Sequence, residues 1–170
     1  MAALKILVTG GVGAGKTTLV STLSEKEGVN TDAVRHASAN TEKQTTTVAF
    51  DYGDLIIEDT PVRLFGTPGQ KRFDYMWEVL CEGIDGMVVL VHTAQPDVVS
   101  YTTELLDIIQ DDQQDVPFVV GLTHTDRPAA DPARIQEAVF AHQAKAVHRV
   151  DARDADSSRS LITTLIDHVV

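Results

Sequence analysis

The sequence predicts an α/β fold with a six-stranded, mostly parallel sheet, one antiparallel edge strand, and helices on both faces. Helical patterns alternate with strand-like runs, which indicates a parallel sheet. A glycine-rich turn follows the first run directly. The runs are short and almost continuously apolar, as strands buried on both faces require, and they cover residues 4–8, 86–91, 117–122 and 146–150.

The other elements follow from local patterns. Helical patterns cover residues 16–24, 73–81, 97–110, 131–143 and 157–169. Two further strand-like runs, 48–57 and 61–65, are joined by only three residues. So short a link permits only an antiparallel pair, which we place at an edge of the sheet. Residues 29–44 are polar and without clear periodicity, which predicts a long loop.

Composition limits the classes of function. The 170 residues, 43% of them apolar, are expected to form one domain over residues 1–170 with a real core. A net charge of -11 makes nucleic acid an unsuitable partner. The single cysteine favours a reducing, cytoplasmic location. We expect no direct membrane anchor, because no apolar run reaches about 20 residues and Ala2 excludes N-myristoylation.

A phosphate-binding motif reads Gly10-x4-Gly15-Lys16-Thr17, between a predicted strand and a predicted helix. Glycines let backbone N–H groups approach phosphates, and a helix N-terminus adds partial positive charge. Lys16 would bridge the β- and γ-phosphates, and the Thr17 hydroxyl would bind Mg²⁺. The pattern predicts a P-loop NTPase fold but fixes neither base nor reaction. The remaining nucleotide contacts predicted here are Gly11, Gly13, Ala14, Gly15 and Thr18.

Two later segments extend this pattern, TTTVAFDY at 45–52 and LFGTPGQKRF at 64–73. With the phosphate loop, they make the chain resemble the Ras-like small GTPases, most closely the bacterial branch related to gliding-motility and actinobacterial conservon GTPases. The resemblance spans essentially the whole chain. It implies a small-GTPase domain that acts as a molecular switch, binds GTP or GDP with Mg²⁺, and slowly hydrolyses GTP. It also implies an effector or GTPase-activating protein as partner, for example one of roadblock type.

The resemblance assigns catalytic roles within these segments. Thr47, on a mobile loop before the second strand, would bind Mg²⁺ and sense the γ-phosphate, with Thr46 as the alternative. Gly69 would offer its N–H to the γ-phosphate, and Gln70 would orient the attacking water. Together with Lys16, Thr47 and Gln70 form the predicted catalytic set.

Two positions depart from the family pattern. Gly66 stands where the family has an aspartate that holds Mg²⁺ through water, so the metal would rest on Thr17, Thr47 and the phosphates. Val12 would crowd the space beside the γ-phosphate, which predicts slow intrinsic hydrolysis. Three cations could act on the phosphates in cis, namely Arg35, Lys43 and Arg72. The alternative is that each is a solvated surface charge.

The family's guanine motif N-K-x-D is matched by residues 123–126, THTD. Asp126 would accept two hydrogen bonds from guanine, a pair that adenine cannot donate. His124 replaces the lysine that packs over the base and Thr123 replaces the asparagine, so we expect weaker nucleotide affinity. In the segment VDARD, the N–H of Ala152 would meet guanine O6, and its neighbour Arg153 is also taken as nucleotide-binding.

Two other functions stay open. A nucleotide-binding scaffold with impaired catalysis would fit Gly66, Val12 and the altered guanine motif. A P-loop nucleoside or nucleotide kinase fits less well, because the sequence contains no arginine cluster for a lid. Tyr75, Met76 and Trp77 would form either a partner surface or part of the core. Ordinary core, surface or strand-end positions are expected for Cys81, His92, His142, His148 and His168.

Overall fold

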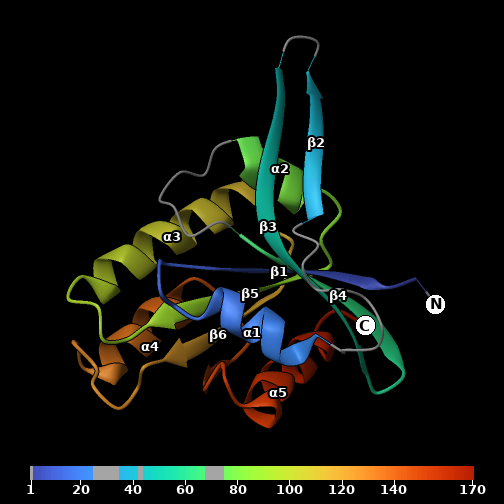
Figure 1. The fold of residues 1–170 in the computed structure, drawn as a ribbon. Coiled ribbons are helices and arrows are strands. Elements are labelled where there is room, and N and C mark those ends of the chain that lie inside the picture. Colours follow the sequence, from blue (N-terminus) through green and yellow to red (C-terminus); the bar gives the residue numbers. More distant parts are fainter. Residues whose placement is uncertain (1, 25–34, 42–43, 68–74) are drawn as a thin grey trace.

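The computed structural model describes residues 2–24, 35–41, 44–67 and 75–170, with side chains for 2–24, 50–67 and 77–170. These residues form a seven-stranded sheet in the order β2-β3-β4-β1-β5-β6-β7 (Figure 1). The strands are β1 Leu4–Gly10, β2 Arg35–Thr41, β3 Gln44–Ile57, β4 Thr60–Gly66, β5 Gly86–His92, β6 Phe118–Thr123 and β7 Val147–Arg149. The helices are α1 Lys16–Leu23, α2 Tyr75–Cys81, α3 Val98–Asp112, α4 Pro132–Ala141 and α5 Ala155–Ile166.

The pairing confirms the predicted fold class. β1 pairs in parallel with β4 and β5, and β6 continues the parallel sheet from β5 to β7. β3 runs antiparallel to β4, as the short link between the two strands requires. All five predicted helices form, with ends shifted by no more than three residues.

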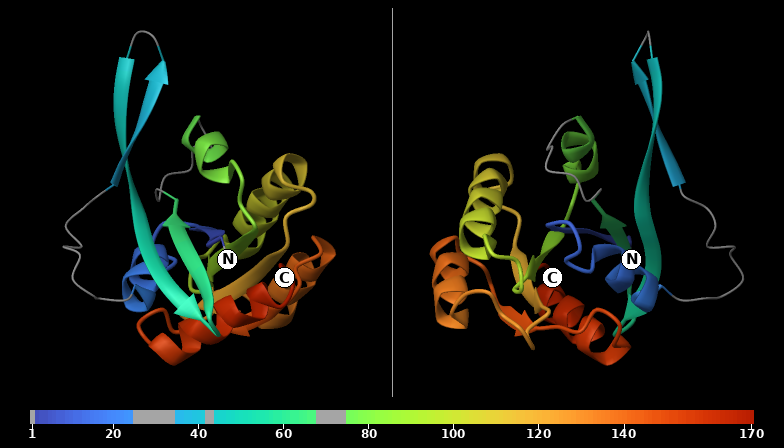
Figure 2. Two further views of the ribbon diagram at one scale, coloured as in Figure 1. Left: turned by 90° about the vertical axis from the view of Figure 1, so that its right-hand side faces the viewer. Right: turned by 60° about the vertical axis from the view of Figure 1, so that its left-hand side comes forward.

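The sheet has one strand more than predicted. β2 lies within residues 29–44, for which we expected a loop, and it pairs antiparallel with the first half of β3. That half begins at Gln44, four residues before the predicted start at 48, and so offers the ladder that β2 joins. The β2–β3 hairpin extends beyond the helices (Figures 1 and 2). The residues of β2, RHASANT, lack the apolar alternation by which a strand is recognised from sequence.

The core consists of two apolar layers, one on each face of the sheet, beneath the helices that Figure 2 shows on either side of it. Successive side chains of β1 alternate between them, since Ile6 and Val8 join one layer and Leu7 joins the other. α1 and α5 cover the first layer, and α2, α3 and α4 cover the second. Burial on both faces explains why the central strands are continuously apolar.

Several side chains left open by the sequence are placed in the core or at helix contacts. Trp77 is 5% exposed, and its Nε1 donates a hydrogen bond to Asp112 at 3.0 Å. Of the two alternatives for this residue, a partner surface or the core, the structure therefore shows the core. Cys81 is buried, and burial raises the pKa of its thiol to about 12. His142 joins α4 to α3, because its Nε2 lies 2.9 Å from Oδ1 of Asp107.

The parallel strands bring their carboxyl ends to one edge of the sheet. β1 ends at Gly10, β5 at His92 and β6 at Thr123, and the register pairs the last two residues directly. Ligands of open α/β sheets bind at this edge. Over the described ranges, every helix is too short or too polar to cross a membrane.

Candidate functional site

The phosphate loop connects β1 to α1 with a backbone that requires glycine. Gly10 has φ +147°, and a Cβ there would lie 2.3 Å from the Leu90 carbonyl oxygen. Gly15 has φ +104°, and a Cβ there would lie 3.1 Å from Cβ of Ala152. Gly15 also caps α1 without a side chain, so the N–H groups of the first helical turn stay free for phosphate oxygens.

Lys16 lies inside the curve of this loop. Its side chain is buried, with the residue 6% exposed, and Nζ donates hydrogen bonds of 2.8 Å to the carbonyl oxygens of Gly10 and Gly11. Burial lowers the pKa of Lys16, and the nearby charge of Asp51 partly opposes this effect. The ammonium group is therefore held within the phosphate loop, the position from which a lysine can reach the phosphates of a nucleotide.

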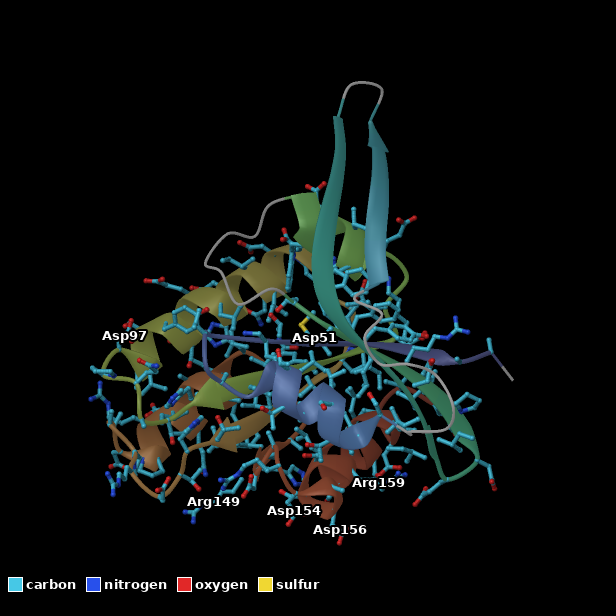
Figure 3. All side chains as sticks on the ribbon, viewed as in Figure 1. Asp51, Asp97, Arg149, Asp154, Asp156 and Arg159 are labelled. Carbon is cyan, nitrogen blue, oxygen red and sulfur yellow. The ribbon has the colours of Figure 1, made fainter. Side chains whose placement is uncertain are left out.

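Asp51 is a site residue that the sequence analysis missed. Its Oδ2 accepts a hydrogen bond of 2.6 Å from Oγ1 of Thr17, and Figure 3 shows it beside α1. β3 places Asp51 directly opposite Gly66 on β4. A Cβ at Gly66 would lie 3.0 Å from Cβ of Asp51. The missing side chain at position 66 therefore leaves room for a carboxylate from the neighbouring strand.

A signal that could have found Asp51 is the short link between β3 and β4. Residues Glu58 and Asp59, with φ of +47° and +67°, form the tight turn between β3 and β4. In such a hairpin each residue pairs with the one equally distant from the turn, so the turn alone places Asp51 opposite Gly66.

The donors at this point fit Mg²⁺. A threonine hydroxyl and a carboxylate are hard oxygen ligands, and Mg²⁺ in nucleotide sites is held by one or two such groups plus phosphates. Among the described residues, no group of three or more His, Cys, Asp or Glu side chains could hold a metal ion. Thr17 and Asp51 would therefore act together with the phosphates of a bound nucleotide.

Thr47 is not brought to this point. It lies within β3, where its backbone pairs with Ser38 of β2, and not in the loop we expected. It is four residues along the strand from Asp51, about 13 Å at the usual rise per residue. The alternative, Thr46, pairs with Ala39 in the same ladder. Outside the described residues lie Lys43, Gly69, Gln70 and Arg72, and for Arg35 only the backbone position at the start of β2 is described.

A cavity of about 680 Å³ adjoins the phosphate loop. Thr123 joins the end of β6 to the phosphate loop at this cavity, since its Oγ1 donates a hydrogen bond to the Ala14 carbonyl oxygen at 2.8 Å. Ala152 is buried against Gly15. The predicted base-binding residues, which stand more than 20 positions apart in two segments, all line this cavity: Thr123, His124, Asp126, Ala152 and Arg153.

An ion pair lies at the cavity, between Arg153 and Asp151. Arg153 is exposed, and its Nε and Nη2 each donate a hydrogen bond of 2.9 Å to the carboxylate of Asp151. These bonds lower the pKa of Asp151 to about 2. Asp126 is exposed at the cavity. His124 stacks on His92, the second residue that the sequence analysis missed.

A family model described as "Conserved hypothetical ATP binding protein" matches residues 8–170. An uncharacterized protein of Methanocaldococcus jannaschii is 31% identical over 123 residues, which are 72% of this chain and 71% of that protein. ADP-ribosylation factor-like protein 8b of Arabidopsis thaliana is 28% identical over 119 residues, which are 69% of this chain and 58% of that protein.

The similarity extends to solved structures. The structure of the Arl6 BBS3 small GTPase from Trypanosoma brucei, with the bound nucleotide analogue GppNp, matches with a TM-score of 0.70 and 14% identity. The match covers 99% of this chain and 98% of that one. At this identity the likeness shows the fold, which is that of Ras- and Arf-like small GTPases. The more specific likeness to the gliding-motility and conservon branch stays a prediction.

Proposed function

Because this chain belongs to the family described as conserved hypothetical ATP-binding proteins, we propose that it is a nucleotide-binding switch, and that its nucleotide is GTP or GDP. The observation that carries the proposal is the cavity beside the phosphate loop, where Asp126 and Ala152 lie together with Gly15. A carboxylate at the base edge accepts the two N–H donors of guanine. Adenine would leave that charge only partly satisfied, which costs binding energy.

The phosphates are bound by the chain's own amides and by Lys16. Lys16 now donates to the carbonyl oxygens of Gly10 and Gly11, and it would exchange these partners for phosphate oxygens. Thr17 and Asp51 would hold Mg²⁺ with them. The ion would neutralise charge on the β- and γ-phosphates.

The switch depends on the β2–β3 hairpin. Thr47 is paired with Ser38 in that hairpin. It would therefore reach the γ-phosphate only if the pairing of β2 with β3 opened around Thr47. GTP, which offers the additional phosphate, would favour the opened form, and GDP would favour the paired form. An effector or GTPase-activating protein, such as one of roadblock type, would bind one of the two forms.

Hydrolysis of GTP would be slow. Gln70 is assigned to orient the water, and Lys16 and Thr47 to stabilise the charge that develops on the phosphates. Val12 is 65% exposed at the tip of the loop, where a partner's side chain that approached the γ-phosphate would meet it.

Competition against fluorescent GDP tests the choice of base. We expect GDP to compete at least about 10-fold better than ADP, the effect of losing a charged hydrogen-bond pair. Asp126→Ala should remove this preference, whereas Asp115→Ala, an exposed carboxylate outside the cavity, should keep it. A preference for ADP would contradict the guanine assignment and favour the ATP named in the family description.

Single-turnover hydrolysis separates the switch from a catalytically impaired scaffold. With Mg²⁺ present, the parent protein should hydrolyse GTP at least about 10-fold faster than Gln70→Ala, because an oriented water is lost in the variant. Chromatography of the nucleotide over time measures both rates. Equal rates at the level of GTP alone in buffer would favour the scaffold.

A further inference from the structure

We propose that His92 is a positioning residue of the base pocket, which holds the His124 ring as the flat surface on which the purine stacks. The inference rests on the proposed function, because it assumes a purine nucleotide in the cavity beside the phosphate loop. It adds a residue from a different strand, outside the sequence segments that the guanine motif covers.

The two imidazole rings form a close stack. Their centroids are 3.6 Å apart and their planes differ by 7°. His92 is the last residue of β5, and the sheet register pairs it with Thr123, the residue before His124. The stack therefore joins the ends of two neighbouring strands at the ligand-binding edge of the sheet.

The two rings face different cavities. His124 lines the cavity of about 680 Å³ together with Asp126, whereas His92 lines a separate cavity of about 230 Å³ beside α3. His92 thus covers one side of the His124 ring from behind. His124 nevertheless stays exposed, so its open surface is on the side of the larger cavity. A purine bound beside Asp126 would stack there as a third ring.

His124 needs external support. Its φ of +56° lies in the left-handed region, which is unfavourable for a side chain larger than glycine. Thr93 supports the backbone, since its Oγ1 donates to the carbonyl oxygens of Thr123 at 2.7 Å and His124 at 2.9 Å. The ring is held by Thr123 Oγ1, 3.1 Å from Nδ1, and by His92. Consecutive residues at the end of β5 therefore fix the backbone and the ring of His124.

The stack requires a neutral His92 ring. Burial, and then the charge of His124, lower the pKa of His92 below its ordinary value of 6.5. Nδ1 of His92 is buried and has no hydrogen-bond partner among the described residues, and the backbone of His92 itself opposes the lowering of the pKa only in part. Asp97 and Tyr101 line the cavity on the His92 side. The charged groups on the His124 side are Asp126, Arg149, Asp151 and Arg153, and Lys16 lies in the phosphate loop. Protonation of His92 would place a cation 3.6 Å from the centre of the His124 ring, and because the pKa of His92 is lowered, the stack should weaken only at a pH lower than 6.5.

The test compares ligands with and without a base. Calorimetry at pH 8 measures the affinities of GDP and of inorganic tripolyphosphate for the parent, His92→Ala and His92→Phe. His92→Ala should weaken GDP binding by about 3- to 10-fold, the range for a lost aromatic stack, and leave the affinity for tripolyphosphate unchanged. His92→Phe should restore most of the loss, because it supplies a ring that does not titrate. His168→Ala, which removes an exposed imidazole outside both cavities, should change neither affinity.

Repeating the titrations at pH 5 distinguishes the stack from general packing. The ratio of GDP affinity to tripolyphosphate affinity should fall more in the parent than in His92→Phe, in which position 92 does not titrate. Equal weakening of both ligands by His92→Ala, no weakening of GDP, or the same pH response in parent and His92→Phe would each overturn the inference while the proposed function stands. A parent that binds tripolyphosphate but neither GDP nor ADP would overturn the proposed function and this inference with it.

Discussion

Replacing Lys16 by alanine is expected to weaken GDP binding by at least about 100-fold, because charge-assisted bonds to more than one phosphate oxygen are lost. Lys16 Nζ lies within 2.8 Å of two carbonyl oxygens of the phosphate loop, so the loop itself fixes its position. The Lys16 side chain therefore loses little further conformational freedom when the phosphates bind. The loop amides remain in the variant, but they supply no full charge.

Calorimetry with Mg²⁺ measures the loss, and thermal unfolding of the nucleotide-free protein supplies the control for folding. Burial is the main cause of the lowered pKa of Lys16, so the ammonium group is costly to bury. The Lys16→Ala protein should therefore unfold at no lower temperature than the parent. Lys145→Ala, which removes an exposed cation far from the loop, should keep the parent affinity. GDP affinity equal to the parent's in Lys16→Ala would contradict the assignment of the phosphate loop.

Removing the carboxylate of Asp51 is expected to reduce strongly the effect of Mg²⁺ on nucleotide affinity. Adding a carboxylate at position 66 of the same variant is expected to restore that effect. Asp51→Gly removes the acceptor of the Thr17 hydroxyl, and the gain in GDP affinity on adding Mg²⁺ should shrink by about 10- to 100-fold. The double variant Asp51→Gly/Gly66→Asp places a carboxylate on the paired position of β4. Because position 51 is then empty of side chain, the 3.0 Å approach between the two Cβ positions no longer occurs.

The measurement is GDP affinity in Mg²⁺ and in EDTA for the parent and the three variants. Gly66→Asp alone is the matched control, since it sets two carboxylates against each other and should lower stability. In EDTA the Asp51→Gly protein should bind GDP as well as the parent or better, because a negative charge near the phosphates is gone. An undiminished Mg²⁺ effect in Asp51→Gly would show that Asp51 does not serve the metal.

Much of the fold could be predicted because its signals are local. The apolar runs of β1, β5 and β6 are continuous since each is buried on both faces, and this requirement is visible in a few consecutive residues. The phosphate loop is also local, because the turn from β1 into α1 requires glycine at positions 10 and 15. The same holds for the segment THTD at the end of β6, whose residues Thr123, His124 and Asp126 line one cavity with Ala152.

The failures all concern contacts between segments. β2 forms only because the first half of β3 offers it a ladder, and its own residues show no strand pattern. Thr47 is drawn into that ladder and away from Thr17 for the same reason. His92 is an ordinary strand end in the sequence, and it becomes a stacking partner only through the register of β5 and β6.

The sequence by itself determined the α/β fold, the phosphate loop and the segments that line the cavity beside it, since each depends on the conformation of a short segment. Only the tertiary structure decided which carboxylate meets Thr17 and which ring supports His124. Both partners come from other strands, and strand register, which the hydrogen-bond ladders fix, sets which side chains meet at the edge of the sheet.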